Sequence, residues 1–382
     1  MQREGEGAAL AGAAPIGVGI VGTGSISRAH IRAYQSFPEA CRIVAVADVD
    51  GARAKAAAEE IGADVAWYEN AQEMFAREDI QLVSVCTPPF SHAELAVAAM
   101  RAGKDVLVEK PMAASLAEAD WMIETADQTG RLLSVVFQYR WIPEWWRAKH
   151  VIAQGALGPV RLARAECLWW RGPKYYDVWW RGTWERECGG ATMNHAIHHI
   201  DTFLWILGEP ASVYAESFAI THEIEVEDLS LAIVHFRSGA IGQITSTTSD
   251  PLDFARMEFS GERAAISLPW RVSAVKEKPD GFPERDADAI ERIEQAAAGV
   301  AMPQHTGHTA QVLDVLKAIR SGRRPLVDGR EGRRSLELIT AIYKSAATGR
   351  RVELPLEKDD PFYTTEGMQK HAKRHRARRR PA

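Results

Sequence analysis

The residues best suited to chemistry are a lysine and a histidine-bearing segment that lie far apart in the sequence. Lys110 follows the apolar run Val106–Val108 and precedes Pro111, so we expect a buried strand that ends at the lysine. Ligands of open α/β sheets bind at the carboxyl ends of strands, where an ammonium group could hold an alkoxide-like oxygen. A solvated surface lysine before a turn is the ordinary alternative.

The second group lies between Gly189 and Asp201. Its two glycines lead into an expected helix that runs to about position 207. Asn194 and His198 are four residues apart and therefore share a face of this helix with Asp201. An imidazole, with an ordinary pKa of about 6.5, could act as a base, whereas an amide can only orient a substrate by hydrogen bonds. His195 and His199 form a rival pair that could chelate a metal, but no third ligand is evident and we predict no metal site.

A dinucleotide-binding turn follows the apolar, strand-like run Ile16–Val21. Gly22 allows a tight turn, Gly24 lets the backbone approach a pyrophosphate, and Ser27 occupies the third glycine position. A second apolar run ends in Asp48, an acid that accepts hydrogen bonds from ribose hydroxyls and repels a 2′-phosphate, so we predict NAD rather than NADP. The predicted cofactor-binding residues are Gly22, Gly24, Ser25, Ile26, Asp48, Thr87, Pro88, His92, Glu109 and Lys110.

The order of the expected elements predicts two domains of the α/β class. Strands alternate with helices up to Phe137, which predicts a doubly wound parallel sheet of the Rossmann type. Later β-leaning segments follow one another without helices, which predicts an α/β domain with a large open, mostly antiparallel sheet. We therefore expect a flexible tail over 1–14, an NAD-binding Rossmann domain over 15–137, a substrate-binding and oligomerisation domain over 138–357 and a basic tail over 358–382.

Composition excludes several classes of protein. A hydrophobic content of 46% and a charged content of 25% are average for a soluble globular protein. The net charge of −5 gives no global attraction to nucleic acid or acidic membranes, and no apolar stretch is long enough for a membrane helix. The four cysteines lack both metal spacing and the density of a disulfide scaffold, so we expect a cytoplasmic protein without nucleic-acid or membrane partners.

Tryptophans crowd into residues 141–184, where eight of the 12 occur. Aromatic faces bind sugar rings, although they also fill cores and subunit interfaces. Arg140 and the pair Arg181 and Trp184 are therefore candidate substrate contacts. A structural or surface ion pair is the alternative for each arginine.

Together, the motifs Gly22-Thr23-Gly24, Thr87-Pro88-Pro89 and Glu109-Lys110-Pro111 and the segment Gly189–Asp201 resemble the Gfo/Idh/MocA family of glucose–fructose oxidoreductases and inositol dehydrogenases. The resemblance spans residues 16–355. It implies a Rossmann domain, a second domain with an open sheet, homodimers or homotetramers, and oxidation of a sugar or cyclitol hydroxyl with NAD(P). Lys110 matches the lysine that faces substrate and nicotinamide in this family, His198 matches its active-site histidine, and Asn194 stands where many members have aspartate.

The resemblance and the residues together predict an NAD-dependent oxidoreductase that acts on a secondary hydroxyl of a sugar, sugar acid or cyclitol. Lys110 would hold the reacting oxygen and His198 would serve as base. Two alternatives are a redox-neutral, NAD-dependent glycoside cleavage and an NAD-sensing regulatory protein, although a regulator has no need of a base. The predicted catalytic residues are Lys110, His198 and Asn194, and the predicted substrate contacts are Lys110, Arg140, Arg181, Trp184, Asn194 and His198.

Overall fold

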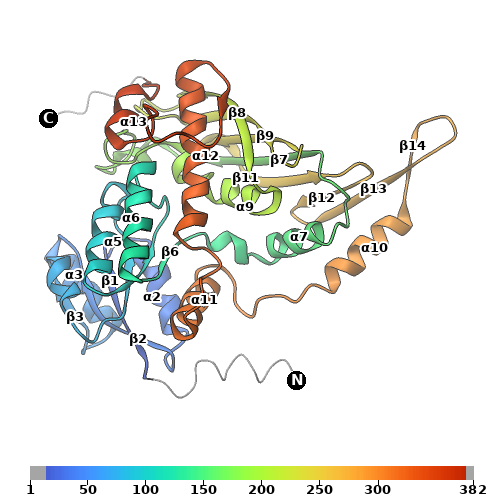
Figure 1. The fold of residues 1–382 in the computed structure, drawn as a ribbon. Coiled ribbons are helices and arrows are strands. Elements are labelled where there is room, and N and C mark those ends of the chain that lie inside the picture. The colour runs from blue at the N-terminus through green and yellow to red at the C-terminus, as the bar shows by residue number, and fades with distance from the viewer. Residues whose placement is uncertain (1–13, 376–382) are drawn as a thin grey trace. The chain divides into compact units, whose positions relative to one another are not determined.

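The computed structural model describes residues 14–375, which form two compact units (Figure 1). Unit 1 comprises residues up to 138 together with 305–333, and unit 2 comprises residues 139–304 and those from 334 onward. The prediction placed 305–333 in the second domain, so the structure differs there. The reason is that helix α11 (Gly307–Ser321) packs against α2 (Ser27–Gln35) and buries Val312, Val315 and Leu316 in the unit 1 core.

Unit 1 is built on a six-stranded sheet with the strand order β3-β2-β1-β4-β5-β6. All its strand pairs are parallel, as the alternation of apolar runs and helices predicted. Every residue of β1 is buried, which explains why the strand reads as a continuous apolar run. The strands are β1 Ile16–Val21, β2 Cys41–Ala47, β3 Ala66–Tyr68, β4 Leu82–Val85, β5 Asp105–Val108 and β6 Leu133–Val135.

Helices cover this parallel sheet as crossover connections. Helices α5 and α6 lie side by side, and α2 lies beside α11 (Figure 1). Several helices begin at a residue whose side chain accepts a backbone N–H; Ser115, for example, caps α6 through the N–H of Glu118. The remaining helices of unit 1 are α3 Gly51–Ile61, α4 Ala71–Phe75, α5 His92–Arg101 and α6 Leu116–Thr129.

Unit 2 contains a nine-stranded sheet in the order β14-β13-β12-β11-β7-β10-β9-β8-β15. Only the pair β7 and β10 is parallel among its described strand pairs, so the sheet is mostly antiparallel, as predicted. The strands are β7 Leu162–Trp170, β8 Pro210–Phe218, β9 Leu229–Phe236, β10 Ile241–Thr247, β11 Ser249–Ser260, β12 Ala264–Leu268, β13 Arg271–Glu277, β14 Pro283–Arg285 and β15 Val352–Glu353.

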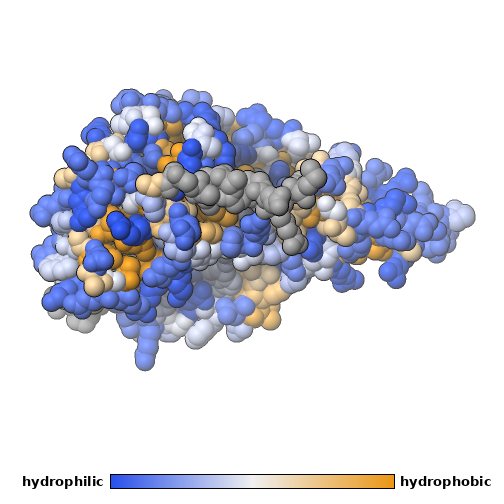
Figure 2. All heavy atoms as spheres, turned by 90° about the horizontal axis from the view of Figure 1, so that it is seen from below, coloured by the Kyte–Doolittle hydropathy of each residue, from blue (hydrophilic) through white to orange (hydrophobic). Residues whose placement is uncertain are grey.

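Helices α7 and α9 of unit 2 pack against each other, and α9 packs against β7. The hairpin of β13 and β14 extends from one end of the sheet, and its surface in Figure 2 is mostly hydrophilic. The helices of this part are α7 Pro143–Ala153, α8 Ala191–Asn194, α9 Ile197–Leu207, α10 Ala287–Ala298, α12 Gly329–Thr348, which begins in unit 1, and α13 Thr365–His371.

The end of the described chain differs from the predicted basic tail. Phe362, Tyr363 and Met368 are buried, and Met368 lies on α13. The Lys373 ammonium donates to the Ser217 carbonyl at 2.8 Å, which ties this segment to β8. Buried apolar side chains therefore hold residues 358–375 in unit 2, although the segment is basic. The rest of the predicted basic tail, 376–382, and residues 1–13 of the predicted amino-terminal tail lie outside the described residues.

No helix between residues 14 and 375 combines the length and apolarity needed to cross a membrane. The four cysteines are all buried, and none of them forms a disulfide bond.

Candidate functional site

The glycine turn after β1 has the geometry that a dinucleotide requires. Gly22 has a φ of 85°, and a Cβ there would lie 2.7 Å from the Cys86 carbonyl oxygen, so only glycine fits. At Gly24 a Cβ would meet nothing within 4 Å, which leaves open space beside the backbone. Ser25 and Ile26 connect this turn to α2, and the Ser27 hydroxyl donates to the Gly24 carbonyl at 2.7 Å. The serine thus stands at the third glycine position and bonds back to the turn, and the amino end of α2 is where a pyrophosphate would bind.

Asp48 follows β2 and lies against this turn. Its Oδ2 accepts hydrogen bonds from the backbone N–H and the hydroxyl of Thr23, at 2.8 and 3.0 Å. Its Oδ1 accepts the Asp50 N–H at 3.0 Å, and the Arg53 guanidinium is 3.7 Å from Oδ2. The carboxylate is thereby held beside the glycine turn, where a ribose of a bound dinucleotide would lie.

Thr87 and Pro88 follow β4 and precede the short 3-10 helix Pro89–Ser91. His92, the first residue of α5, is completely buried, and its two ring nitrogens lie 2.8 Å from the Pro111 carbonyl oxygen and 2.7 Å from that of Thr87. Both nitrogens are therefore occupied by backbone groups. The ring thereby joins the segments that follow β4 and β5, and its contact with the cofactor stays a prediction.

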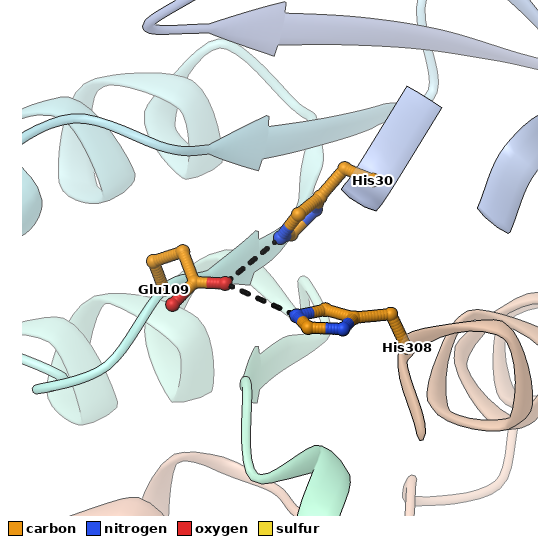
Figure 3. A group of neighbouring side chains, drawn as sticks. All are labelled: His30, Glu109 and His308. Atoms are coloured by element: carbon orange, nitrogen blue, oxygen red, sulfur yellow. Dashed lines mark hydrogen bonds and ion pairs between the residues drawn. The ribbon is translucent and has the colours of Figure 1, made fainter. Parts of the chain in front are cut away.

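Lys110 comes two residues after the end of β5, as the proline predicted. It is partly buried, and its backbone N–H donates to Oε2 of the preceding Glu109 at 3.1 Å. Glu109 itself is buried among His30 from α2 and His308 from α11 (Figure 3). Sequence reasoning did not find these two histidines. For His30 a local signal exists, since His30 and Tyr34 are polar residues four apart on the buried face of an amphipathic helix.

The segment after Gly189 carries the candidate groups of unit 2. Where one helix was predicted, the structure has two, α8 and α9, separated by His195 and Ala196. Asn194 ends α8, and its amide nitrogen donates to the Gly189 carbonyl at 3.0 Å. His198 lies in the first turn of α9 with 5% of its surface exposed, and its ring stacks on Tyr139 with centroids 4.5 Å apart and an interplanar angle of 15°.

The rival histidines His195 and His199 lie among aromatic side chains. The His195 Nε2 is 2.9 Å from the Tyr175 hydroxyl. His199 is buried between the rings of Tyr139, Trp145 and Trp169, and burial lowers its pKa to about 4. His199 is thus a neutral core residue at neutral pH.

Glu227 anchors the start of this segment, although sequence reasoning missed it. Its buried carboxylate accepts the N–H groups of Gly190 and Thr192, at 3.0 and 2.9 Å, and the Tyr343 hydroxyl at 2.9 Å. A Cβ on Gly190 would lie 1.9 Å from the Glu227 carbonyl oxygen. The glycine is therefore needed for this close approach, which sets where α8 begins.

Arg140 is a structural residue, which corrects the prediction of a substrate contact. Its side chain is 2% exposed and forms two hydrogen bonds with Asp201, Nε to Oδ2 at 2.9 Å and Nη2 to Oδ1 at 2.7 Å. The Ser335 hydroxyl also donates to Oδ1, at 3.3 Å. Through these two bonds the guanidinium holds α9.

Trp184 is likewise a core residue. It is 4% exposed, and its ring contacts Tyr343 edge-on with centroids 4.9 Å apart, which is not the position of a substrate platform. Arg181 is partly exposed; its guanidinium lies over the rings of Tyr175 and Trp180 and pairs with Glu187 at 2.9 Å. Burial raises the pKa of Glu187 to about 7, against the opposing effect of Arg181.

Both halves of the chain match models of known protein families. Residues 16–137 match the model of an oxidoreductase family with an NAD-binding Rossmann fold, and residues 145–267 match that of the GFO/IDH/MocA C-terminal domain. An inositol 2-dehydrogenase from Rubrobacter xylanophilus is 27% identical over 344 residues, which cover 87% of this chain and 92% of that protein. D-glucoside 3-dehydrogenase of Escherichia coli is 25% identical over 362 residues, or 89% of this chain and 98% of that protein.

Among solved structures, the WlbA dehydrogenase from Chromobacterium violaceum, in complex with NADH and UDP-GlcNAcA, is similar with a TM-score of 0.79. It is 32% identical, and the match covers 90% of this chain and 97% of that structure.

Proposed function

Because this chain belongs to the GFO/IDH/MocA oxidoreductase family and has its NAD-binding Rossmann domain, we propose that it oxidises a secondary hydroxyl of a sugar, sugar acid or cyclitol with NAD. The observation that carries the proposal is the position of Lys110. Its ammonium group follows β5, two strands from the dinucleotide turn that follows β1. Both positions are at the carboxyl edge of the parallel sheet, where ligands of such sheets bind.

Lys110 is proposed to hold the reacting oxygen. NAD, when bound, accepts the hydride that the alcohol carbon loses. The alcohol oxygen meanwhile gains negative charge as its proton leaves, and an ammonium group stabilises that charge. A backbone fixed at the end of a strand suits this role, because the rate depends on the position of the ammonium group relative to the reacting oxygen.

His198 is proposed as the base that takes the hydroxyl proton. Its ring is held against Tyr139, and a histidine is the ordinary side chain for proton transfer near neutral pH. The hydrogen bond from Asn194 to the Gly189 carbonyl fixes the plane of the amide, which suits a residue that orients a substrate by hydrogen bonds.

The substrate class comes from the relatives. Their names specify an inositol, a D-glucoside and a nucleotide-linked sugar acid, which share secondary hydroxyls on a ring. We therefore expect a cyclic polyol or pyranoside. The partly exposed Arg181 with its aromatic neighbours is the remaining candidate among the predicted arginine contacts.

The test is to mix purified protein with NAD and a panel of sugars, inositols, glycosides and sugar acids, and to follow the absorbance of NADH. A steady rise with one ligand class supports the dehydrogenase. Lys110→Ala should abolish the rise while NADH binding changes less than about twofold, since the lysine acts at the reacting oxygen. Glycoside cleavage without net NADH would instead support the redox-neutral alternative, and full activity of Lys110→Ala would refute the role of the lysine.

Self-association through the sheet of unit 2 is proposed as well. One face carries apolar side chains that are 38–49% exposed on β8, β9, β10 and β11, of which the first three are adjacent and β11 is separated from β10 by β7. Tyr214 and Ile233 among them are paired directly across β8 and β9. Contiguous apolar surface of this kind marks interfaces. These residues are Tyr214, Leu231, Ile233, Ile241 and Phe254.

Light scattering of the purified protein tests this proposal. We expect the mass of a dimer or tetramer for the natural chain and a smaller mass for Ile233→Asp, because a charge at the centre of the face opposes burial. A monomeric natural protein would contradict it.

A further inference from the structure

A buried carboxylate lies next to Lys110, and its side-chain partners among residues 14–375 are two histidines. Glu109 is 4% exposed, and its Oε1 is 3.0 Å from Nε2 of His30 and 3.7 Å from Nε2 of His308 (Figure 3). Its Oε2 accepts the Lys110 backbone N–H at 3.1 Å. The two oxygens of one carboxylate thus join two helices, α2 and α11, to the residue that carries the proposed ammonium group.

The proton on His30 can be assigned from its neighbours. The His30 Nδ1 is 3.1 Å from the Ser84 hydroxyl, which is 2.7 Å from the Tyr34 hydroxyl. If Tyr34 donates to Ser84 and Ser84 donates to Nδ1, then Nε2 carries its proton toward Glu109 and every group is satisfied. The reverse direction would aim a lone pair of neutral His30 at the carboxylate. Burial raises the pKa of Tyr34, so the phenol keeps the proton that this arrangement needs.

His308 is the second support of the same carboxylate. Its Nε2 is buried and makes no hydrogen bond within 3.5 Å to the part of the chain that the structure describes, and it faces Oε1 of Glu109 at 3.7 Å. Burial by itself would raise the pKa of Glu109, but the interactions with His30 and His308 hold it well below its usual range. His308 is thus placed to make a second charge-assisted contact with the carboxylate.

We propose that His30 and His308 are positioning residues that hold Glu109 and, through it, the backbone from which Lys110 projects. The proposal rests on the function assigned to Lys110 above. It also gives a reason for the return of residues 305–333 to unit 1, since the first turn of α11 delivers His308 to the carboxylate. Catalytic geometry tolerates little error, and a misplacement of about 1 Å can cost on the order of a hundredfold in rate.

The same three side chains are the only group within residues 14–375 that places three potential metal ligands together. A zinc site with two histidines and one carboxylate is known chemistry. However, a proton on Nε2 of His30 serves the carboxylate and would have to be lost before a metal could bind there. The positioning role needs only the hydrogen bonds that Glu109 already forms with His30 and with the Lys110 N–H. Metal binding would replace the bond from His30, so metal uptake is the competing outcome of the test.

The test compares His308→Phe with His305→Phe as a matched control. His305 lies three residues earlier and contacts Phe37 edge-on, with centroids 5.1 Å apart and no carboxylate partner. We expect His308→Phe to lower kcat about tenfold or more, while KM for NAD changes less than about twofold. His308→Gln can still donate an N–H to Glu109 and should recover at least about half of the loss, whereas the control should match the natural protein.

Hydrogen exchange of the Lys110 amide supplies a measurement that does not depend on the proposed reaction. We expect faster exchange in His308→Phe and near-normal exchange in His308→Gln and in the control, because the amide proton is held by Glu109. Faster exchange in a protein without dehydrogenase activity would retain the positioning role and reject the proposed function. If His308→Phe does not fold, His308→Ala is judged by the same two criteria.

Two results would overturn the inference. One is normal kcat and normal amide exchange in His308→Phe. The other is uptake of one equivalent of Co²⁺ by the natural protein with loss of that uptake in His308→Phe, since a metal would replace the hydrogen bond from His30.

Discussion

Stability should fall in mild acid because of His199. The side chain is 1% exposed, neither ring nitrogen makes a hydrogen bond to any described residue, and aromatic rings surround it. Burial lowers its pKa from 6.5 to about 4. Between these two pH values, His199 therefore stays neutral in the folded protein but is protonated in the unfolded chain.

The sign and size of the effect follow from that difference. Between pH 6.5 and about 4 the unfolded state binds more protons than the folded state, so stability is complete above pH 6.5 and is lost as the pH falls through this window. At about 1.36 kcal/mol per pKa unit, the whole window corresponds to about 3 kcal/mol. About 2 kcal/mol of this should be lost by pH of about 5.

The assay is urea unfolding of the natural protein and of His199→Phe, followed by tryptophan fluorescence at about pH 7.5 and about pH 5. Fluorescence suits the purpose because Trp145 and Trp169 lie next to the ring. Other titrating groups, such as Glu187, contribute equally to both proteins and cancel in the difference. We expect the natural protein to lose about 2 kcal/mol more than the variant on acidification. Equal losses would refute the assignment of His199 as a buried neutral residue.

Three further predictions concern residues whose roles the structure specifies. Arg140→Met should lower the free energy of unfolding by about 3–5 kcal/mol, measured in urea, because Asp201 is left as a buried charge; a stable variant with a raised KM would instead restore the substrate-contact interpretation. Gly190→Ala should lower Tm by many degrees, since its Cβ would lie 1.9 Å from a carbonyl oxygen, whereas Gly62→Ala, with nothing within 4 Å, should fold normally. Asp48→Asn should lower the ratio of kcat/KM for NAD over NADP about tenfold or more, because a 2′-phosphate is no longer repelled; an unchanged ratio would contradict the role of the carboxylate.

The features that could be predicted from sequence are those that local patterns determine. The apolar run before Lys110 is stopped by the proline that follows the lysine, and the run before Asp48 stops at that acid, so both residues follow parallel strands as expected. The glycine at position 22 requires a positive φ, which the structure has. Each of these signals depends on a few neighbouring residues and on the period of a strand or helix.

Features that depend on a distant partner could not be predicted in this way. Arg140 was a candidate substrate contact because the sequence around an arginine near a strand end does not reveal whether its side chain binds a ligand or an acidic side chain. Its actual partner, Asp201, lies 61 residues further along the chain. Similarly, the start of α8 is held by Glu227, which accepts the N–H groups of Gly190 and Thr192 although it lies more than thirty residues further along the chain.

Each candidate segment is held in place by a buried carboxylate of its own. Glu109 holds the backbone of Lys110, Glu227 holds the start of α8, and Asp201 joins α9 to Arg140. Burying a carboxylate costs several kcal/mol unless hydrogen bonds or charges satisfy it, so each acid accepts only a narrow range of positions for its partners. An apolar contact would tolerate sliding that these directional bonds do not. The hydrogen bonds of these carboxylates therefore fix the positions of the segments they contact. Glu109→Gln or Glu227→Gln should disturb the geometry of the adjoining segment more than an apolar substitution of equal size elsewhere in the core.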